Sequence, residues 1–347
     1  MPHDIRPTAE DDLPELSRFL IEGFHAPADA PFAALDVLRW KYFDPIEDEP
    51  RSYIGRDTET GGIVGHLGVW RSRFHGRGFG LPAEGIATLH MIDWLSAKTA
   101  VGVGAALMRR AHQSCPVQYG FGGSVAGRTV GERGGYALMA NVPVYHRVLR
   151  PSYRLREPGH GWVGRTGRAL GDVAGNARRR PKRPRRAIEL EQLGSFREDV
   201  APILERYEAR AIFTSRGAGV LNHALRYPRG GLSGWLIRRD GAVRGLAVLV
   251  VIPGAPRIGR IAECLLDDPD DLDLWHSAIH ALTRELEGQG ADRAVGVGST
   301  EWSRRALAAS GYYHAHDVEF RLRDRGNLIP RDAVFHFTLM EADYAYS

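Results

Sequence analysis

Two closely spaced glycines lie where backbone N–H groups could bind an anion. Gly102 and Gly104 follow residues 86–95, which have the pattern of a β-strand, and lie at the start of residues 102–113, which have the pattern of a helix. Glycine lets the backbone approach a ligand closely, and the N–H groups of a first helical turn lack intrahelical partners. This order is typical of a loop that holds a pyrophosphate, although glycines here also allow a helix to pack on a sheet.

The loop differs from the common nucleotide-binding motifs. No Gly-Lys-Ser/Thr follows the two glycines, so the loop is not a P-loop, and its Gly-x-Gly-Ala-Ala-Leu spacing departs from the dinucleotide-binding fingerprint. The chain has two cysteines, Cys115 and Cys264, which are too few for a disulfide scaffold or a zinc ribbon. They form no Cys-x-x-Cys pair, and we expect no metal site.

The positive charge of the chain is local. The sequence has 46 Lys and Arg against 42 Asp and Glu, a net charge of +4. Seven of these basic residues lie in RRRPKRPRR, which runs from Arg178 to Arg186 without an acid; the rest of the chain is slightly acidic. We expect this run to be a solvated linker, with an acidic carrier protein as a candidate partner. It contains no aromatic residue to stack on bases, so we expect no nucleic-acid partner.

The elements that position the glycines belong to one of two predicted domains, since an average domain has about 150 residues. An N-terminal domain at 1–150 and a C-terminal domain at 187–347 are separated by a Gly-, Arg- and Pro-rich linker at 151–186 that we expect to be loosely packed. In the first domain, periodicity predicts two helices before residue 45, strands at 51–56, 62–74, 86–95 and 117–122, and helices at 102–113 and 124–134.

The two domains look like copies of each other. Six residues between positions 37 and 57 are identical to the residues 183 positions later. In each half a Gly-Ser pair, at Gly123 and Gly298, precedes a helix-like segment that closes on a Gly-Tyr pair, at Gly135 and Gly311. This shared order predicts a duplication of one mixed α/β unit.

The glycine loop and its surroundings resemble a known family. Thr99-Ala100-Val101-Gly102-Val103-Gly104 is similar to motif A of the GNAT (Gcn5-related N-acetyltransferase) superfamily, Arg/Gln-x-x-Gly-x-Gly/Ala. The resemblance implies an α/β (α+β) fold of two tandem GNAT-like domains, each a mixed, mostly antiparallel sheet flanked by helices. It also implies acetyl-CoA or another acyl-CoA as cofactor. The cofactor-binding residues would be Trp94, Ser96, Thr99, Val101, Gly102, Val103, Gly104 and Ala105.

The sequence departs from the family pattern at several positions. Thr99 replaces the usual Arg or Gln, and Gly131 stands where a Tyr often protonates the leaving thiolate, so no general acid is assigned. In the second half the corresponding segment is ECLLDDPDDLDL, residues 263–274, which has no Gly-x-Gly and contains five Asp. Because these carboxylates repel a pyrophosphate, we expect the second half to have lost CoA binding.

The catalytic candidates follow from the implied chemistry. An amine must lose a proton before it attacks a thioester, which suits a base with a pKa near 6–7. His90, on the strand before motif A, is the first candidate for this base, and Glu84 and Asp93 are the next. Trp40 and Tyr42 lie where the family often builds its acceptor pocket. Each of these side chains also has a purely structural interpretation, as a packed or solvated residue.

We therefore expect an acyl-CoA-dependent N-acyltransferase that transfers an acetyl or other acyl group to an amine of a small molecule or peptide by direct attack. Two alternatives stay open: an aminoacyl-tRNA-dependent aminoacyltransferase of the cell-wall type, and a non-catalytic acyl-CoA-binding regulatory protein. The polar start of the sequence and the lack of an apolar run of about 20 residues predict a cytoplasmic protein without a membrane span.

Overall fold

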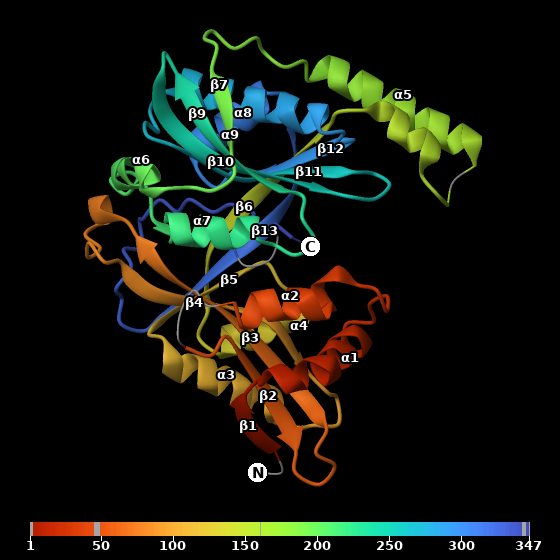
Figure 1. Cartoon of the computed structure of the whole chain (residues 1–347), viewed down its shortest axis with the longest axis vertical. Helices are drawn as coiled ribbons and strands as arrows, with labels where there is room; N and C mark the ends of the chain where they lie inside the picture. Colours follow the sequence, from red (N-terminus) through yellow and green to blue (C-terminus); the bar gives the residue numbers. More distant parts are fainter. Residues whose placement is uncertain (1–2, 45–48, 160, 342–344, 347) are drawn as a thin grey trace.

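A computed structural model describes residues 3–44, 49–159, 161–341 and 345–346. One continuous sheet runs through the molecule, with helices against its faces (Figure 1). Twelve strands follow the order β1-β2-β3-β4-β5-β13-β6-β12-β11-β10-β9-β7, and β8 pairs with β3.

The first half contains nearly all the predicted elements, with bounds that agree within a few residues. Its strands and helices are β1 (His3–Pro7), α1 (Leu13–Gly23), α2 (Leu35–Tyr42), β2 (Ser52–Asp57), β3 (Ile63–His75), β4 (Ile86–Ser96), α3 (Val103–Ser114), β5 (Val117–Phe121), α4 (Val125–Arg133) and β6 (Ala137–Val148). The first strand, β1, is an edge strand that the sequence patterns did not predict.

The second half repeats this series. Its elements are β7 (Glu189–Leu193), α6 (Ala201–Tyr207), β8 (Phe213–Thr214), α7 (Ala218–Leu225), β9 (Leu232–Arg239), β10 (Ala242–Ile252), β11 (Ile258–Leu266), α8 (Leu272–Gly288), β12 (Arg293–Val297), α9 (Glu301–Ala309) and β13 (Tyr313–Asp324). Short 3-10 helices lie at Glu10–Asp12, Pro31–Ala33, Arg77–Phe79, Pro151–Arg156 and Glu198–Val200.

The two halves exchange their last strands. Read from either end, the strand order has the same pattern, with β1 matching β7, β4 matching β11 and β5 matching β12. β13 of the second half pairs antiparallel with β5 of the first, while β6 of the first half pairs antiparallel with β12 of the second. β13 and β6 also pair with each other at the centre. Each half therefore completes the sheet of the other, and this symmetry supports the predicted duplication.

Equivalent helices also meet between the halves. Trp40 on α2 and His223 on α7 are 183 positions apart, which is the offset of the sequence repeat. Their rings stack at 4.6 Å with an interplanar angle of 3°, and Trp40 Nε1 donates to the His223 carbonyl at 3.0 Å. The repeat that is visible in the sequence is thus also an internal contact.

The predicted linker contains a helix. α5 (Trp162–Arg178) spans 17 residues and none of its side chains is buried. The linker prediction did not include this helix, which forms where apolar residues recur at helical spacing; because none of its side chains is buried, loose packing of the segment stays a prediction. Residues 180–188, which include Pro181 and Pro184, form no helix. The assignment of 1–150 and 187–347 as separate domains stays a prediction, since the sheet is continuous across both.

Candidate active site

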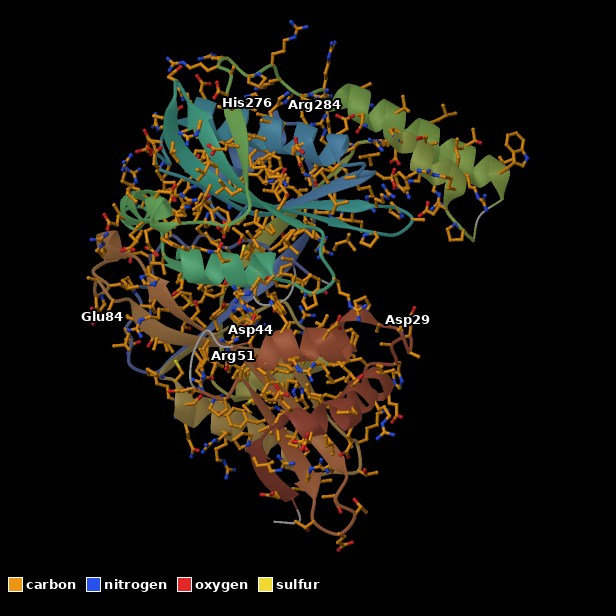
Figure 2. All side chains as sticks on the ribbon, in the orientation of Figure 1. Asp29, Asp44, Arg51, Glu84, His276 and Arg284 are labelled. Atoms are coloured by element: carbon orange, nitrogen blue, oxygen red, sulfur yellow. The ribbon has the colours of Figure 1, made fainter. Side chains whose placement is uncertain are left out.

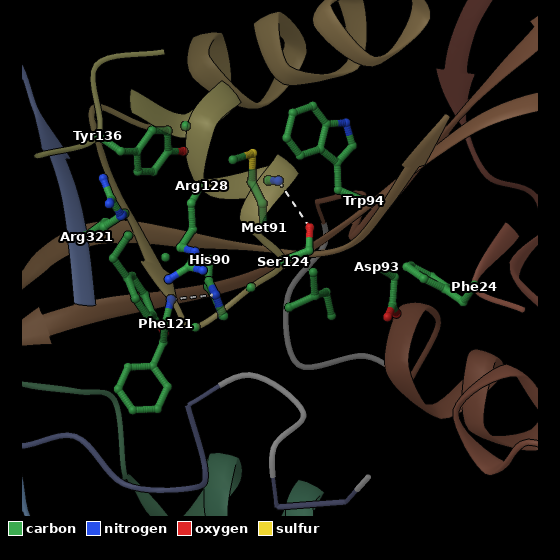
Figure 3. Close-up of a pocket in the computed structure, with 17 residues that line it drawn as sticks. Phe24, His90, Met91, Asp93, Trp94, Phe121, Ser124, Arg128, Tyr136 and Arg321 are labelled. Atoms are coloured by element: carbon green, nitrogen blue, oxygen red, sulfur yellow. Dashed lines mark hydrogen bonds between the residues drawn. The ribbon is translucent and has the colours of Figure 1, made fainter. Parts of the chain in front are cut away.

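A cavity opens where β4 and β5 diverge. The two strands pair in parallel at only three positions, Thr88 to His90 against Val117 to Tyr119. β5 then continues beside β13, and within the described ranges no strand pairs with β4 on that side beyond His90. The cavity between them has a volume of about 280 Å³ and is closed on one side by α4 (Figure 3). Main-chain groups of β4 are thereby left available to a ligand that lies along the strand.

A bulge in β4 shapes the wall of this cavity. The register against β3 shifts where Gly68 pairs with Ile92 and His66 pairs with Leu95, so that β4 carries an extra residue. Asp93, in this bulge, has φ of 47°, a left-handed conformation that non-glycine residues adopt only in special settings. The strained residue lies directly on the wall of the cavity.

The side chain of Asp93 is fixed by two neighbours on α2. Its carboxylate accepts hydrogen bonds from Lys41 Nζ at 2.8 Å and from the Tyr42 hydroxyl at 2.5 Å. Burial opposes ionisation of the Asp93 carboxyl, but Lys41 and Tyr42 outweigh it and lower its pKa. Asp93 is therefore ionised and paired at neutral pH, which makes it a poor proton acceptor.

A buried hydrogen-bond chain holds the main chain of the bulge. His66 Nδ1 donates to the Asp93 carbonyl at 2.8 Å, and His66 Nε2 accepts from the Ser52 hydroxyl at 2.9 Å. The Ser52 oxygen in turn accepts from Thr8 at 2.6 Å. Burial lowers the pKa of His66 to about 4, so the ring is neutral and keeps this tautomer. The left-handed residue is thus fixed through both its side chain and its carbonyl.

His90 lies in the cavity wall, and its neutral ring has one nitrogen that accepts a hydrogen bond and one that can donate. Its Nε2 accepts from the Phe121 backbone N–H at 3.1 Å, so the proton of the neutral ring is on Nδ1 (Figure 3). The ring stacks on Tyr119 with centroids 4.8 Å apart, and Nδ1 is buried without a hydrogen-bond partner among the described residues. Burial lowers the pKa of His90 to about 3. These features argue against the predicted role of His90 as a base.

The N-terminus of α3 has the conformation that the motif predicts. Gly102 is the N-cap residue with φ of 88°, and no side chain of the described residues caps this end. Val101 beside it is 87% exposed, so the loop faces solvent. A Cβ atom on Gly104 would lie 3.2 Å from Ser96 Oγ and 3.7 Å from the Trp94 ring. Trp94 also lines the cavity, so the helix N-terminus and the cavity are adjacent.

The wall formed by α4 is unusually open. Gly127 and Gly131 lie four residues apart, on one face of the helix, and both line the cavity. Gly131 provides no phenol, and the nearby Tyr136 hydroxyl instead donates to Gln118 Oε1 at 2.6 Å. Burial raises the pKa of Tyr136. A glycine-rich loop, GFGG at 120–123, completes this side; its composition was a signal in the sequence that our prediction did not use.

Two arginines in the cavity wall were also missed. Arg128 comes from α4 and Arg321 from the exchanged strand β13, and both line the cavity (Figure 3). Both also pair with Glu319, at 2.7 Å and 2.8 Å. Arg321 lies some 190 residues from Arg128 in the sequence, so no local pattern could bring the two together. The cavity is therefore built from both halves of the chain.

The other predicted site residues have varied locations. Glu84 is exposed before the start of β4, away from the cavity (Figure 2). Trp40 is buried in the core between the halves. Tyr42 does not line the cavity, but its hydroxyl donates to Asp93, which does. Thr99 is exposed in the turn before Gly102. The structure thus brings together Trp94, Asp93 and His90, but not Glu84 or Trp40.

Metal-binding and membrane-spanning features are not evident in the described ranges. His276 and His280 are four residues apart on α8, and His314 is paired with Asp317 at 2.8 Å. No group of three or more His, Cys, Asp or Glu among the described residues could hold a metal ion. In the same part of the chain, no helix has the length and apolar character that a bilayer crossing requires.

Comparison with known proteins supports the fold. No model of a protein family and no curated protein matches the sequence. An N-myristoyltransferase from Saccharomyces cerevisiae with bound myristoyl-CoA is similar in structure, with a TM-score of 0.60, 12% identity, and coverage of 93% of this chain and 79% of that one. A GCN5-related N-acetyltransferase from Anabaena variabilis has a TM-score of 0.58 and 10% identity, with 93% and 72% covered.

A third structure, a probable N-acyltransferase of unknown function from Enterococcus faecalis, has a TM-score of 0.59 and 11% identity, with 92% of this chain and 71% of that chain covered. At these identities the likeness establishes the fold alone. The prediction of a tandem GNAT-like fold with a mixed, mostly antiparallel sheet is confirmed.

Proposed function

We propose that the chain is an acyl-CoA-dependent N-acyltransferase whose cofactor binds in the first half. The observation that carries this proposal is the adjacency of three features. These are the uncapped N-terminus of α3, the unpaired edge of β4 after His90, and the cavity between β4 and β5. An extended molecule with an anionic end and an amide-containing arm is complementary to these three parts.

The main chain does most of the binding in this proposal. The N–H groups of Gly102, Gly104 and Ala105 hold the pyrophosphate, since Gly102 is the N-cap residue of α3 and the other two lie in its first turn. The pantetheine arm lies along β4 from Met91 to Trp94 and forms hydrogen bonds with the strand edge that β5 leaves free. The Trp94 ring covers the arm near Ser96 and Gly104.

The reaction joins the amine nitrogen to the thioester carbonyl carbon and breaks the carbon–sulfur bond, with a proton passing from the amine to the thiolate or to solvent. We propose that His90 donates its Nδ1–H to the carbonyl oxygen, where negative charge develops in the transition state. In this role His90 polarises the carbonyl and does not remove the amine proton.

The proposed chemistry predicts the pH dependence of the rate. His90 has a pKa of about 3 and Asp93 is paired with Lys41, so neither side chain takes up a proton from the amine near neutral pH. The reacting amine is then the fraction that is already neutral in solution. The rate of transfer should rise about tenfold for each pH unit below the pKa of the amine, without a step near pH 6.5.

A panel of acyl-CoAs tests the proposal, with thermal shift for binding and CoA release for transfer to small and peptide amines. Gly104→Glu and Val101→Glu should each weaken acyl-CoA binding by roughly 100-fold or more, because a carboxylate then faces the pyrophosphate. Val101 is exposed, so its variant should fold normally. Gly219→Glu on α7, where a Cβ meets no atom within 4 Å, is the matched control and should bind like the parent. Equal binding by all four proteins would refute the site.

A second candidate, an acyl-CoA-binding regulatory protein without transfer activity, is favoured by one specific observation. Gly131 supplies no phenol, and the Tyr136 hydroxyl is already bonded to Gln118. Binding of acyl-CoA without release of CoA to any amine in the panel would select this function. The aminoacyl-tRNA alternative gains less support, because the basic segment after α5 lies at the end of the molecule opposite α3 (Figure 1).

A further inference from the structure

Helix α5 faces the protein with its polar side. Four polar residues fall at i, i+3, i+7 and i+11 and bond to residues 148–157, the end of β6 and the segment that precedes the helix. Asp172 accepts from Arg154 at 2.8 Å, and Asn176 donates to the Val148 carbonyl at 2.9 Å. Arg168 pairs with Glu157 at 2.9 Å, and Arg165 donates to the Leu155 carbonyl at 3.3 Å.

The apolar side of α5 faces solvent instead. Val163, Leu170 and Val173 lie on one face and are 68%, 63% and 52% exposed, and Trp162 at the helix start is 75% exposed. An ordinary surface helix buries its apolar stripe against the core, so this arrangement is inverted. Four large apolar side chains on one exposed helix face form a surface that favours contact with an apolar partner.

The segment after α5 adds a dense positive charge. All seven Lys and Arg side chains at 178–186 are exposed. Among the described residues, one ion pair links this run to an acid: Arg185 lies 3.6 Å from Asp273. The run is fixed beside the second half, since Lys182 N donates to the Ala309 carbonyl at 2.9 Å and Ser277 donates to the Arg186 carbonyl at 3.0 Å.

The run also borders a hollow. Lys182, Arg183 and Arg185 line a cavity of about 530 Å³ together with Arg305, His276 and one carboxylate, that of Asp273. A cavity with this lining suits a phosphate or carboxylate group. Together, α5 and the following segment extend over one end of the molecule, remote from β1 and α3 (Figure 1).

We propose that α5 and residues 178–186 form a docking surface for an anionic lipid bilayer. The apolar face of α5 enters the boundary between headgroups and acyl chains, with the Trp162 indole at the interface, and the basic run contacts lipid phosphates and carboxylates. Charge complementarity selects this occupant. A bilayer supplies a plane of negative charge over an apolar layer, which matches both parts of the surface, whereas a protein partner would need an apolar groove flanked by a row of acids.

Sedimentation of the full chain with vesicles tests this docking surface. We expect binding to vesicles of phosphatidylcholine mixed with phosphatidylserine, much less binding to phosphatidylcholine alone, and loss of binding as salt rises. The double variant Leu170→Glu, Val173→Glu and the triple variant Arg178→Glu, Arg180→Glu, Arg183→Glu should each lower the partition coefficient by roughly 100-fold.

Matched controls separate this surface from general charge and hydrophobicity. Leu328→Glu alters an exposed leucine elsewhere, and Arg18→Glu, Arg197→Glu, Arg331→Glu removes three exposed arginines elsewhere. Both controls should bind mixed vesicles like the parent. Equal binding by the parent and the α5 variants would overturn the proposal. It would also be overturned if light scattering showed a dimer that Leu170→Glu, Val173→Glu converts to a monomer, since the face would then join two copies.

Discussion

The N-termini of α3 and α8 occupy equivalent places in the two halves, yet their free N–H groups meet different partners. At α3 the cap residue is Gly102, which brings no side chain to the helix end. At α8 the cap residue is Asp271, whose carboxylate accepts from Leu274 N at 2.8 Å. The second half therefore satisfies an N–H group of its helix end with a carboxylate of its own, while no side chain of the described residues does so at α3.

The two halves also differ in the gap between their diverging strands. β11 and β12 pair at three positions, as β4 and β5 do, and then separate. In the second half this space is occupied by the C-terminal part of the chain, where Met340 N donates to the Ala262 carbonyl of β11 at 3.2 Å. A cavity of only about 20 Å³ is left beside Trp275 and His336. The first half therefore has a cavity of about 280 Å³ between its diverging strands, whereas the C-terminal part of the chain fills the equivalent space in the second half.

The aspartates of the second half have a different role from the one expected. We predicted that five Asp at 267–273 would repel a pyrophosphate, but arginines of neighbouring elements neutralise several of them. Asp267 pairs with Arg206 and Arg244, and Asp271 with Arg239. Loss of CoA binding in the second half stays a prediction, and the occupied helix end and filled strand gap now support it better than charge repulsion.

The largest predicted effect concerns the network that holds the C-terminal segment in place. Buried Arg216 pairs with Glu263 and, at 2.6 Å, with Glu341, and Glu341 accepts from Tyr119 of the first half at 3.0 Å. Arg216→Met leaves two buried carboxylates without a cation and should destabilise the fold by about 3–5 kcal/mol. Urea unfolding measures this. Arg226→Met removes an exposed pair with Asp44 and should cost under about 1 kcal/mol; an equal loss in both variants would contradict the account.

The same network predicts sensitivity to acid. Burial opposes ionisation of Glu263, but Arg216 and His336 outweigh it and lower its pKa from 4.5 to about 2. Because the folded pKa lies below the ordinary value, Glu263 stabilises the fold above pH 4.5, and this contribution is lost as the pH falls toward 2. Urea midpoints measured across this range should fall less steeply in Glu263→Gln than in the parent. Glu59→Gln, in an exposed turn, should leave the slope unchanged.

The next effect tests the difference between His90 and an ordinary structural histidine. If Nδ1–H stabilises the developing oxyanion, His90→Phe should lower kcat by roughly 100-fold with little change in acyl-CoA binding. His90→Gln can still accept from Phe121 and donate into the cavity, so it should retain more activity. Steady-state kinetics with a fixed amine decide this. A threefold or smaller loss in His90→Phe would remove His90 from the reaction.

The smallest effect compares two helix caps. Ser124 accepts from Gly127 N at 3.1 Å at the start of α4, and Asp271 caps α8. Ser124→Ala should cost about 1 kcal/mol of stability, and Asp271→Ala should cost more, because it also removes the ion pair with Arg239. Only Ser124→Ala should also weaken acyl-CoA binding, because Ser124 lines the cavity. Thermal melts with and without acyl-CoA separate the two effects, and a gain of a second binding site in Asp271→Ala is not expected.

Local patterns predicted the elements of the first half well because these elements are short and end at clear turn or loop residues. The Gly-x-Gly loop between β4 and α3, and the repeat at an offset of 183, could both be read from the sequence. Contacts between distant segments could not. The strand exchange that brings Arg321 beside Arg128, and the segment that reaches Ala262 from residue 340, depend on tertiary pairing. The hydrogen bond from Phe121 that fixes the His90 tautomer likewise has no local signal.

The stoichiometry of acyl-CoA binding tests the central claim most directly. Calorimetry on the full chain should give one site per chain, and Val101→Glu should abolish it while the Gly219→Glu control retains it. This result would place the cofactor at α3 and leave the second half as the partner that completes the sheet and the cavity wall. Two equal sites per chain, or one site that Val101→Glu does not affect, would contradict the account.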